Sequence, residues 1–503
     1  MKQSQPEAPG AGALPDPVSN GSRGETARNV FVMGAAQAWR VGIGFAFTVV
    51  SARLLAPSDF GLIAMVMTVT ALVTMIQDLG ATQAVVQRDK ITQGQLNALF
   101  WIAVGLGVAL AALLALSGPA VARFFGDQRL EGLMAAFAVP IIATGIQAVP
   151  FALLNRHMRF GRLALVDAVA AGASFVVGVV LAWQFESYWA LYAAACASSL
   201  VMLVGCWVGS GFRPGKATFD RETRAMVGFG SGVTGFNLAN YFSRNADKVL
   251  IGKYFGDISL GFYDRAYRLL LFPLSQIHAP IGRVMIPLLS RNLSDPERYR
   301  RSYMECVSIL LLATQPAILF ATIYAEEVFR LLLGERWVAS APIFVWLGIA
   351  GLHQVMTSTV GWLYISQGRG GAFFRLGLFG AVTTVAAFVA GMPWGPVGVA
   401  AAYAISDYVV RLPVIWASAG REGPVSARDL YVMAAPHALA TLVAAAALFA
   451  LKFQVDAGNI FTCGALAVLG YAVYLGALML FAEKRAYLFR NAEFLRTRLA
   501  KQV

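Results

Sequence analysis

Long apolar runs alternate with short polar segments along almost the whole chain after its first 22 residues. A helix needs about 20 apolar residues to cross the hydrocarbon core of a bilayer. Fourteen runs reach that length, and they predict an all-α polytopic membrane protein with about 14 transmembrane helices. The predicted helices are residues 29–53, 59–83, 96–117, 131–154, 162–183, 188–209, 224–253, 261–286, 302–324, 339–367, 373–391, 396–417, 430–452 and 459–482.

Two short segments that lie 200 residues apart resemble each other. The first runs from Arg53 to Gly61 and reads RLLAPSDFG, and the second runs from Lys253 to Gly261 and reads KYFGDISLG. Each has a basic residue, a polar turn with an aspartate, and a glycine that opens the next helix. Six predicted helices separate the copies, so both halves have the same orientation. The repeat predicts two six-helix lobes related by a pseudo-two-fold axis along the membrane normal, followed by two more helices.

The division of the chain follows from these helices. Residues 1–28 are expected to form a disordered cytoplasmic tail, because they are rich in Pro, Gly and Ala and lack the apolar core of a signal peptide. The other expected parts are an N-lobe at 29–209, an inter-lobe linker at 210–223, a C-lobe at 224–417, two appended helices at 430–482 and a basic cytoplasmic tail at 483–503.

Charge sets the expected orientation. Hydrophobic residues make up 58% of the chain and charged residues only 13%, yet the net charge is +13. Most of the 40 Lys and Arg residues lie in the two tails and in alternate loops, which predicts a bacterial inner-membrane protein with both termini in the cytoplasm. Orientation and anionic lipid account for this excess, so no nucleic-acid partner is expected. The basic residues of the opposite side are Arg53, Arg123, Arg129, Lys253, Arg330, Arg336 and Lys452.

Ionisable and amide side chains concentrate in three of the predicted helices. In helix 224–253 the spacing of three and four residues puts several of them on one face, and this polar stripe consists of Asn237, Asn240, Arg244 and Lys248, beside Asp247. The next helix has Asp264, Arg265 and Arg268 near its outer end, and helix 29–53 has Arg40 near its centre. Charged groups at bilayer depth are costly unless they face a partner or a polar cavity.

Two interpretations of these charges are possible. Asp264 and Arg268 are spaced as an i,i+4 pair, as are Asp407 and Arg411, and such pairs neutralise themselves. Arg40 has no partner nearby in the sequence, and cations outnumber acids within the predicted helices. A net-cationic chamber between two lobes implies an anionic cargo, and the planar fork of arginine is well suited to phosphate.

The sequence contains no motif for metal or nucleotide binding. The four cysteines lie in apolar segments without metal-ligand spacing, so we expect no metal and no cofactor. His278, His353 and His437 are isolated in apolar helices, where a structural imidazole is the expected role. Without a nucleotide-binding loop, uphill transport would depend on an ion gradient or on the gradient of the substrate itself.

Five blocks of sequence occur in order within residues 29–417. They read ARLLAPSDFGLIAM, DLGATQAVVQ, NADKVLIGKYFGDISLGFYDRAYRL, IPLLSRNLSDPERYRRSY and EEVFRLLLGERWVASAPIFVWLGIAGL. These blocks resemble the bacterial polysaccharide flippases of the Wzx type, in the multidrug/oligosaccharidyl-lipid/polysaccharide exporter superfamily. The resemblance is greatest to exporters of exopolysaccharides such as colanic acid or succinoglycan.

The resemblance implies two six-helix bundles around a V-shaped cavity and alternating access. It implies transport of an undecaprenyl-pyrophosphate-linked oligosaccharide to the periplasmic leaflet, with a polymerase and a chain-length regulator as partners. The residues that match as holders of the pyrophosphate are Arg40, Arg244, Lys248, Arg265 and Arg268, to which the polar stripe adds Asn240. Asp247 or Asp264 would bind a driving ion, H⁺ or Na⁺, because each lies beside these cations.

Alternatives remain open at this point. A multidrug exporter, or an exporter of another lipid-linked precursor such as lipid II, would belong to the same superfamily, but a drug antiporter usually has an acidic cavity. An integral membrane polymerase or ligase usually needs a sizeable periplasmic loop, and the longest outward loop expected here is 325–338. The sequence therefore favours a transporter over an enzyme.

Overall fold

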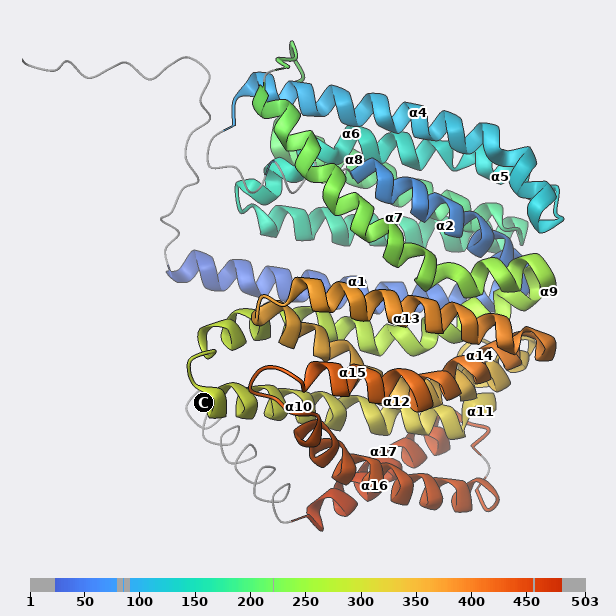
Figure 1. The fold of residues 1–503 in the computed structure, drawn as a ribbon. Coiled ribbons are helices and arrows are strands. Elements are labelled where there is room, and N and C mark those ends of the chain that lie inside the picture. Colours follow the sequence, from blue (N-terminus) through green and yellow to red (C-terminus); the bar gives the residue numbers. More distant parts are fainter. Residues whose placement is uncertain (1–22, 79–84, 86–90, 220, 456, 482–503) are drawn as a thin grey trace, which may run out of the picture. The chain divides into compact units, whose positions relative to one another are not determined.

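The computed structural model describes residues 23–78, 85, 91–219, 221–455 and 457–481, and these residues form α-helices joined by short turns without any strand (Figure 1). For residues 23–32, 78, 221–240, 242–244 and 273–279 it describes the backbone alone. The predicted all-α class is confirmed. Two compact units divide the chain, Met1–Gly261 and Phe262–Val503.

The first unit contains seven complete helices and the first part of an eighth among its described residues. They are α1 (Arg23–Leu54), α2 (Pro57–Asp78), α4 (Gln93–Phe125), α5 (Arg129–Ala136), α6 (Ala138–Arg156), α7 (Phe160–Phe185), α8 (Trp189–Ser210) and the start of α9 (Arg221–Arg291). Helix α7 packs against both α1 and α8, and α6 packs against both α4 and α8.

Local sequence explains where these helices begin and end. Thr92 accepts a hydrogen bond from the backbone N–H of Gln95, whose side chain accepts one from the Thr92 N–H in return, and this capping box starts α4. The helix ends at Gly126, whose φ of 81° is left-handed and favours glycine. Helix α9 is interrupted at Gly256, with φ 80° and ψ −175°, which separates the two helices predicted at 224–253 and 261–286.

The second unit continues from α9 through the remaining helices. They are α10 (Pro296–Ile323), α11 (Ala325–Leu332), the 3₁₀ turn η1 (Glu335–Ser340), α12 (Ala341–Ser366), α13 (Gly370–Gly391), η2 (Met392–Trp394), α14 (Gly395–Ser406), the π-helical turn η3 (Asp407–Arg411), α15 (Leu412–Ala419), α16 (Ala427–Lys452) and α17 (Ile460–Met479).

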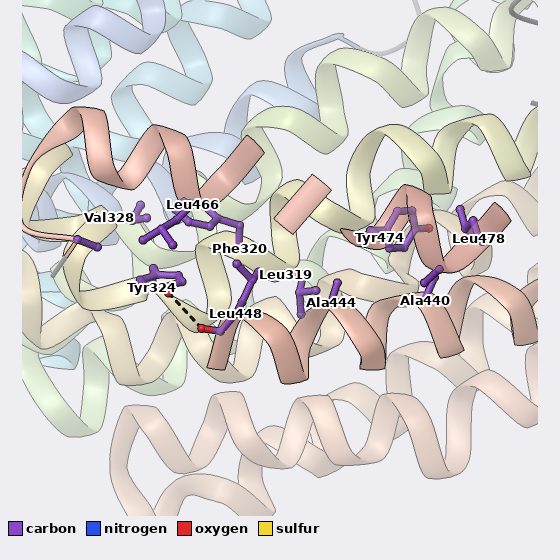
Figure 2. Packing of buried hydrophobic residues seen from close by; sticks show 12 residues of the cluster. Leu319, Phe320, Tyr324, Val328, Ala440, Ala444, Leu448, Leu466, Tyr474 and Leu478 are labelled. Carbon is purple, nitrogen blue, oxygen red and sulfur yellow. Dashed lines mark hydrogen bonds between the residues drawn. The ribbon is translucent and has the colours of Figure 1, made fainter. Parts of the chain in front are cut away.

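An apolar core in the second unit joins the last two helices to α10. Leu319 and Phe320 of α10, Ala444 and Leu448 of α16, and Tyr474 of α17 are buried together (Figure 2). At one end the Tyr324 hydroxyl donates to the Leu448 carbonyl over 3.1 Å, so the polar tip of this buried ring is satisfied. The appended helices are therefore an integral part of this unit.

Ten stretches of the described residues are long and apolar enough to cross a membrane. One of them, Gly370–Ala419, is 50 residues long and is broken near Gly395, so it covers two of the predicted crossings. Helix α1 begins at Arg23 instead of Asn29, and α4 extends to Phe125, beyond the predicted end at 117. The chain is a multi-pass membrane protein, and the total of 14 crossings and the division into six-helix lobes stay predictions.

Candidate substrate and ion sites

The two repeated segments pack against each other through their glycines. A Cβ atom on Gly61 would lie 1.8 Å from the carbonyl oxygen of Asp257, and one on Gly261 would lie 2.0 Å from the carbonyl oxygen of Pro57. The contact is reciprocal, because the partners of the two glycines are also 200 residues apart. Only glycine allows two backbones to approach this closely. The repeat therefore marks a close crossing of α2 with the turn inside α9.

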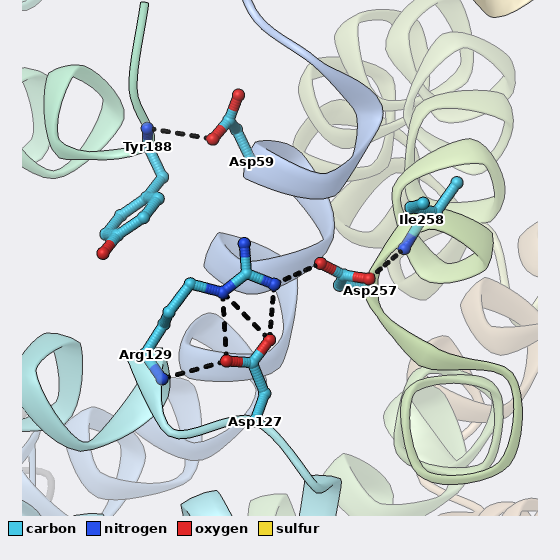
Figure 3. Close-up of polar contacts among 6 residues, drawn as sticks. All are labelled: Asp59, Asp127, Arg129, Tyr188, Asp257 and Ile258. Carbon is cyan, nitrogen blue, oxygen red and sulfur yellow. Dashed lines mark hydrogen bonds and ion pairs between the residues drawn. The ribbon is translucent and has the colours of Figure 1, made fainter.

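Ion pairs lie beside this crossing. The Arg129 guanidinium, at the start of α5, contacts Asp127 at 2.6 Å and Asp257 at 2.7 Å (Figure 3). The hydrogen bonds from Arg129 lower the pKa of the Asp127 carboxyl below its usual range. Asp59 accepts a hydrogen bond from the backbone N–H of Tyr188 at 3.1 Å (Figure 3). It accepts another from the backbone N–H of Ala56 at 3.0 Å, and so fixes the start of α2. Polar contacts thus join α5 to α9, and the start of α2 to the turn before α8, within the first unit.

Two lysines make equivalent contacts in the two units. One lies at the end of the first part of α9, and the other lies at the end of α16. The Lys253 ammonium donates to the Phe124 carbonyl at the end of α4, and the Lys452 ammonium donates to the Ile323 carbonyl at the end of α10, over 2.7 Å. A cation at a helix C-terminus stabilises the exposed carbonyls there. Both lysines belong to the basic residues that the sequence assigns to the outer side, and both have a structural role.

Three predicted site residues have described side chains in the first unit. Arg40 is exposed, donates to Gln37 Oε1 over 3.0 Å, and is close enough to Asp167 of α7 for an electrostatic interaction. The local sequence offers Arg40 no acidic partner, and the fold brings Asp167 toward it from a helix that is distant in the chain. Asp247 is buried and Lys248 is half-buried. The side chains of Asn240 and Arg244, predicted for the same site, lie outside the described residues.

The second unit contains the other three predicted site residues, all on α9. Arg268 Nε lies 2.6 Å from Asp264 Oδ2, which confirms the i,i+4 pair. The Asp264 side chain is 1% exposed, whereas 47% of the Arg268 side chain is exposed. Arg265 is half-buried beside them. Arg268 therefore has donors that remain open to a further anion after its pairing with Asp264.

One buried cluster of charged side chains was not predicted in full from the sequence. His353 of α12 has Nε2 at 3.0 Å from Asp407 Oδ2, and Arg411 pairs with the other oxygen of that carboxylate. Sequence spacing predicts the pair of Asp407 with Arg411, and the structure confirms it. The approach of α12 to the π-helical turn adds the histidine, and no sequence spacing indicates a contact between residues so far apart in the chain.

Comparisons with known proteins agree with a membrane transporter fold. The structure is similar to that of lipid II flippase MurJ in an inward closed conformation, with a TM-score of 0.73 and 13% identity, over 89% of this chain and 99% of MurJ. At this identity the likeness concerns the fold alone.

Proteins of related sequence allow a narrower family assignment than the fold does. The chain is 24% identical over 393 residues to the lipopolysaccharide biosynthesis protein WzxC of Escherichia coli (strain K12), covering 75% of this chain and 79% of WzxC. It is 24% identical over 413 residues to the succinoglycan biosynthesis transport protein ExoT of Rhizobium meliloti (strain 1021), covering 82% of this chain and 83% of ExoT. The profile of the family described as polysaccharide biosynthesis protein matches residues 50–342, more than half of the chain. The chain therefore belongs to the polysaccharide biosynthesis protein family.

Proposed function

We propose that this chain is a flippase that moves an undecaprenyl-pyrophosphate-linked oligosaccharide from the cytoplasmic to the periplasmic leaflet. The single observation that carries the proposal beyond the family is Arg268, a guanidinium within the predicted membrane helices that stays 47% exposed although its partner Asp264 is buried. A guanidinium in a membrane-spanning helix is costly unless it faces a partner or a polar cavity, so the exposed part of Arg268 would face the cavity that takes the substrate. The transported unit would serve the synthesis of an exopolysaccharide or another surface polysaccharide.

The cationic residues of α1 and α9 are the proposed holders of the diphosphate. Arginine and lysine donate several charge-assisted hydrogen bonds to phosphate oxygens, and they replace the water that the headgroup loses on entering the protein. Asn240 would add an uncharged donor to a sugar or phosphate oxygen. The proposed substrate-binding set is Arg40, Asn240, Arg244, Lys248, Arg265 and Arg268.

Alternating access is the proposed mechanism. The two lobes, 29–209 and 224–417, would open toward the cytoplasm to take the headgroup while the polyprenyl tail stays in lipid, and would then rock to release it on the other side. Both termini would lie in the cytoplasm, and a polymerase and a chain-length regulator would use the product. The names of the relatives WzxC and ExoT and the fold likeness to MurJ support this mechanism.

The test follows the lipid-linked oligosaccharide in cells that lack this protein. Wild-type protein should restore export, whereas Arg40→Gln and Arg268→Gln should reduce it about 10- to 100-fold, since each loses a charged hydrogen-bond donor worth roughly 1.5–3 kcal/mol. Arg330→Gln is the matched control, because this arginine lies between two of the membrane stretches and pairs with exposed Glu335 at the start of the second. Unimpaired export in cells without the protein would contradict the proposed function.

The acids beside these cations are the proposed sites of the driving ion, H⁺ or Na⁺. Asp247 and Asp264 are 2% and 1% exposed, so a carboxylate there depends strongly on a bound cation or a neighbouring base. We expect Asp247→Asn and Asp264→Asn to slow transport and to reduce its dependence on an imposed ion gradient, measured in proteoliposomes at equal protein content. Unchanged transport and unchanged ion dependence in the double variant would remove this assignment.

A further inference from the structure

Three charged or titratable side chains lie together inside the second unit, and none of them belongs to the proposed substrate site. The Asp407 carboxylate lies between His353, 3.0 Å from Oδ2, and Arg411, which pairs with Oδ1. Their side chains are 3%, 2% and 12% exposed, respectively. Two bases therefore share one buried carboxylate, and the cluster is neutral with a neutral imidazole and carries one positive charge with an imidazolium.

The backbone around Asp407 departs from an α-helix. Asp407–Arg411 forms a π-helical turn in which the Leu412 N–H donates to the Asp407 carbonyl, five residues earlier. Such turns are rare, and proteins often place them at functional sites. The turn directs both Asp407 and Tyr408 at α12, where the rings of His353 and Tyr408 meet edge to face with centroids 4.3 Å apart.

His353 is not held as a structural histidine would be. Neither ring nitrogen has a hydrogen bond of good geometry among the described residues, although Nε2 is at ion-pair distance from Asp407. Leaving a buried polar group unsatisfied costs about 1–3 kcal/mol. A proton on the ring replaces this penalty with attraction between an imidazolium and a carboxylate, which depends less on alignment than a neutral hydrogen bond does.

His437, in the same unit, shows the contrast. Its Nδ1 is 2.7 Å from the Tyr474 hydroxyl, and that hydroxyl also lies 2.9 Å from the Gln315 side-chain oxygen. This buried imidazole is hydrogen-bonded to a neutral phenol, as expected for a structural role. Both histidines look alike in the sequence, isolated in apolar helices, so the difference arises only from the groups that the fold brings to them.

Several neighbouring elements contribute side chains around His353 and its partners. The π-helical turn contributes Asp407, Tyr408 and Arg411, and α14 contributes Tyr403, whose ring lies under the Arg411 guanidinium at 4.7 Å. Helix α13 contributes the uncharged Thr384, which Arg411 contacts, and α10 contributes Gln315, which donates to the Leu352 carbonyl next to His353. Asp407 is thus the acid that faces the ring.

From this geometry we infer that His353 and Asp407 form a proton-binding site in the interior of the second unit. A proton on His353 draws the carboxylate toward the ring and loosens its hold on Arg411, so that proton occupancy changes how α12 packs against the π-helical turn. The inference rests on the proposed flippase function only for its effect on transport. Proton binding itself is a property of the cluster and can be measured without substrate.

The direct test observes the ring nitrogens of the protein's four histidines by NMR after selective ¹⁵N labelling of histidine in the full-length protein in lipid nanodiscs. His353→Gln assigns the signal by its loss. We expect the His353 ring to bind a proton as the pH is lowered, and Asp407→Asn to change that proton binding. A His353 ring that stays neutral as the pH is lowered, or whose protonation is identical in Asp407→Asn, would overturn the inference. If Asp407→Asn fails to fold, the titration of wild-type protein decides alone.

The consequence for transport is tested separately in proteoliposomes. An imposed pH gradient should change the rate of lipid-linked oligosaccharide transport by wild-type protein and by the matched control His437→Gln. In His353→Gln the ratio of rates with and without the gradient should fall to near unity while transport persists. A full response in His353→Gln would refute the role in coupling. Absence of transport by wild-type protein would count against the proposed function and would leave the NMR result standing.

Discussion

Replacing Gly61 with alanine is expected to abolish most transport and to lower the apparent melting temperature of the purified protein. The new Cβ atom would lie 1.8 Å from the carbonyl oxygen of Asp257, which is backbone and cannot rotate away. The two segments would have to separate by more than 1 Å, and overpacking of this kind typically costs about 1–3 kcal/mol. Separation would also strain the contact of Arg129 with Asp257 beside the crossing.

Two further variants make this test specific. Gly261→Ala should reproduce the effect, because its Cβ would meet the Pro57 carbonyl at 2.0 Å. Gly105→Ala in α4 is the matched control, since nothing lies within 4 Å of its Cβ position and alanine is the better helix former by about 1 kcal/mol. Wild-type stability and transport in Gly61→Ala would show that the close crossing is not required in the working protein.

Apolar periodicity was sufficient for the fold class but not for every helix boundary. A run of apolar residues predicts a helix because a membrane-spanning backbone must satisfy its own hydrogen bonds. It does not show where that helix ends outside the bilayer. Helix α4 continues to Phe125, beyond its predicted end, and Gly126 ends it in the left-handed conformation. Local chemistry at a cap, and not hydropathy, determines that boundary.

Contacts between distant segments were the harder part of the site. The sequence reveals the repeat of Gly61 and Gly261, but not that the copies touch each other, because identity between segments contains no information about their distance. For the same reason, the sequence did not predict that Asp167 of α7 lies near Arg40 or that His353 approaches Asp407. In contrast, the pair of Asp264 with Arg268 follows from helical spacing, since residues four apart always share a face.

Removing the Asp407 side chain is expected to cause a large loss of stability in the second unit. Asp407→Ala would leave the Arg411 guanidinium, 12% exposed, without its carboxylate, and an uncompensated buried charge costs about 3–5 kcal/mol. Thermal unfolding of the purified protein in one detergent measures the effect. Glu335→Ala is the control, because its side chain is 74% exposed in its pair with Arg330, and such pairs contribute only about 0–1 kcal/mol.

A double variant separates the loss of the pair from the exposure of the charge. Asp407→Leu combined with Arg411→Met replaces the ion pair with apolar side chains, and such replacements are often neutral or stabilising. We therefore expect the double variant to be more stable than Asp407→Ala, which would identify the unpaired Arg411 as the cause of instability. Equal instability of both variants would instead mean that the carboxylate contributes through His353, whose Nε2 lies 3.0 Å from the Asp407 Oδ2 atom. The stability cycle thus tests the same cluster as the proton measurements, by an independent property.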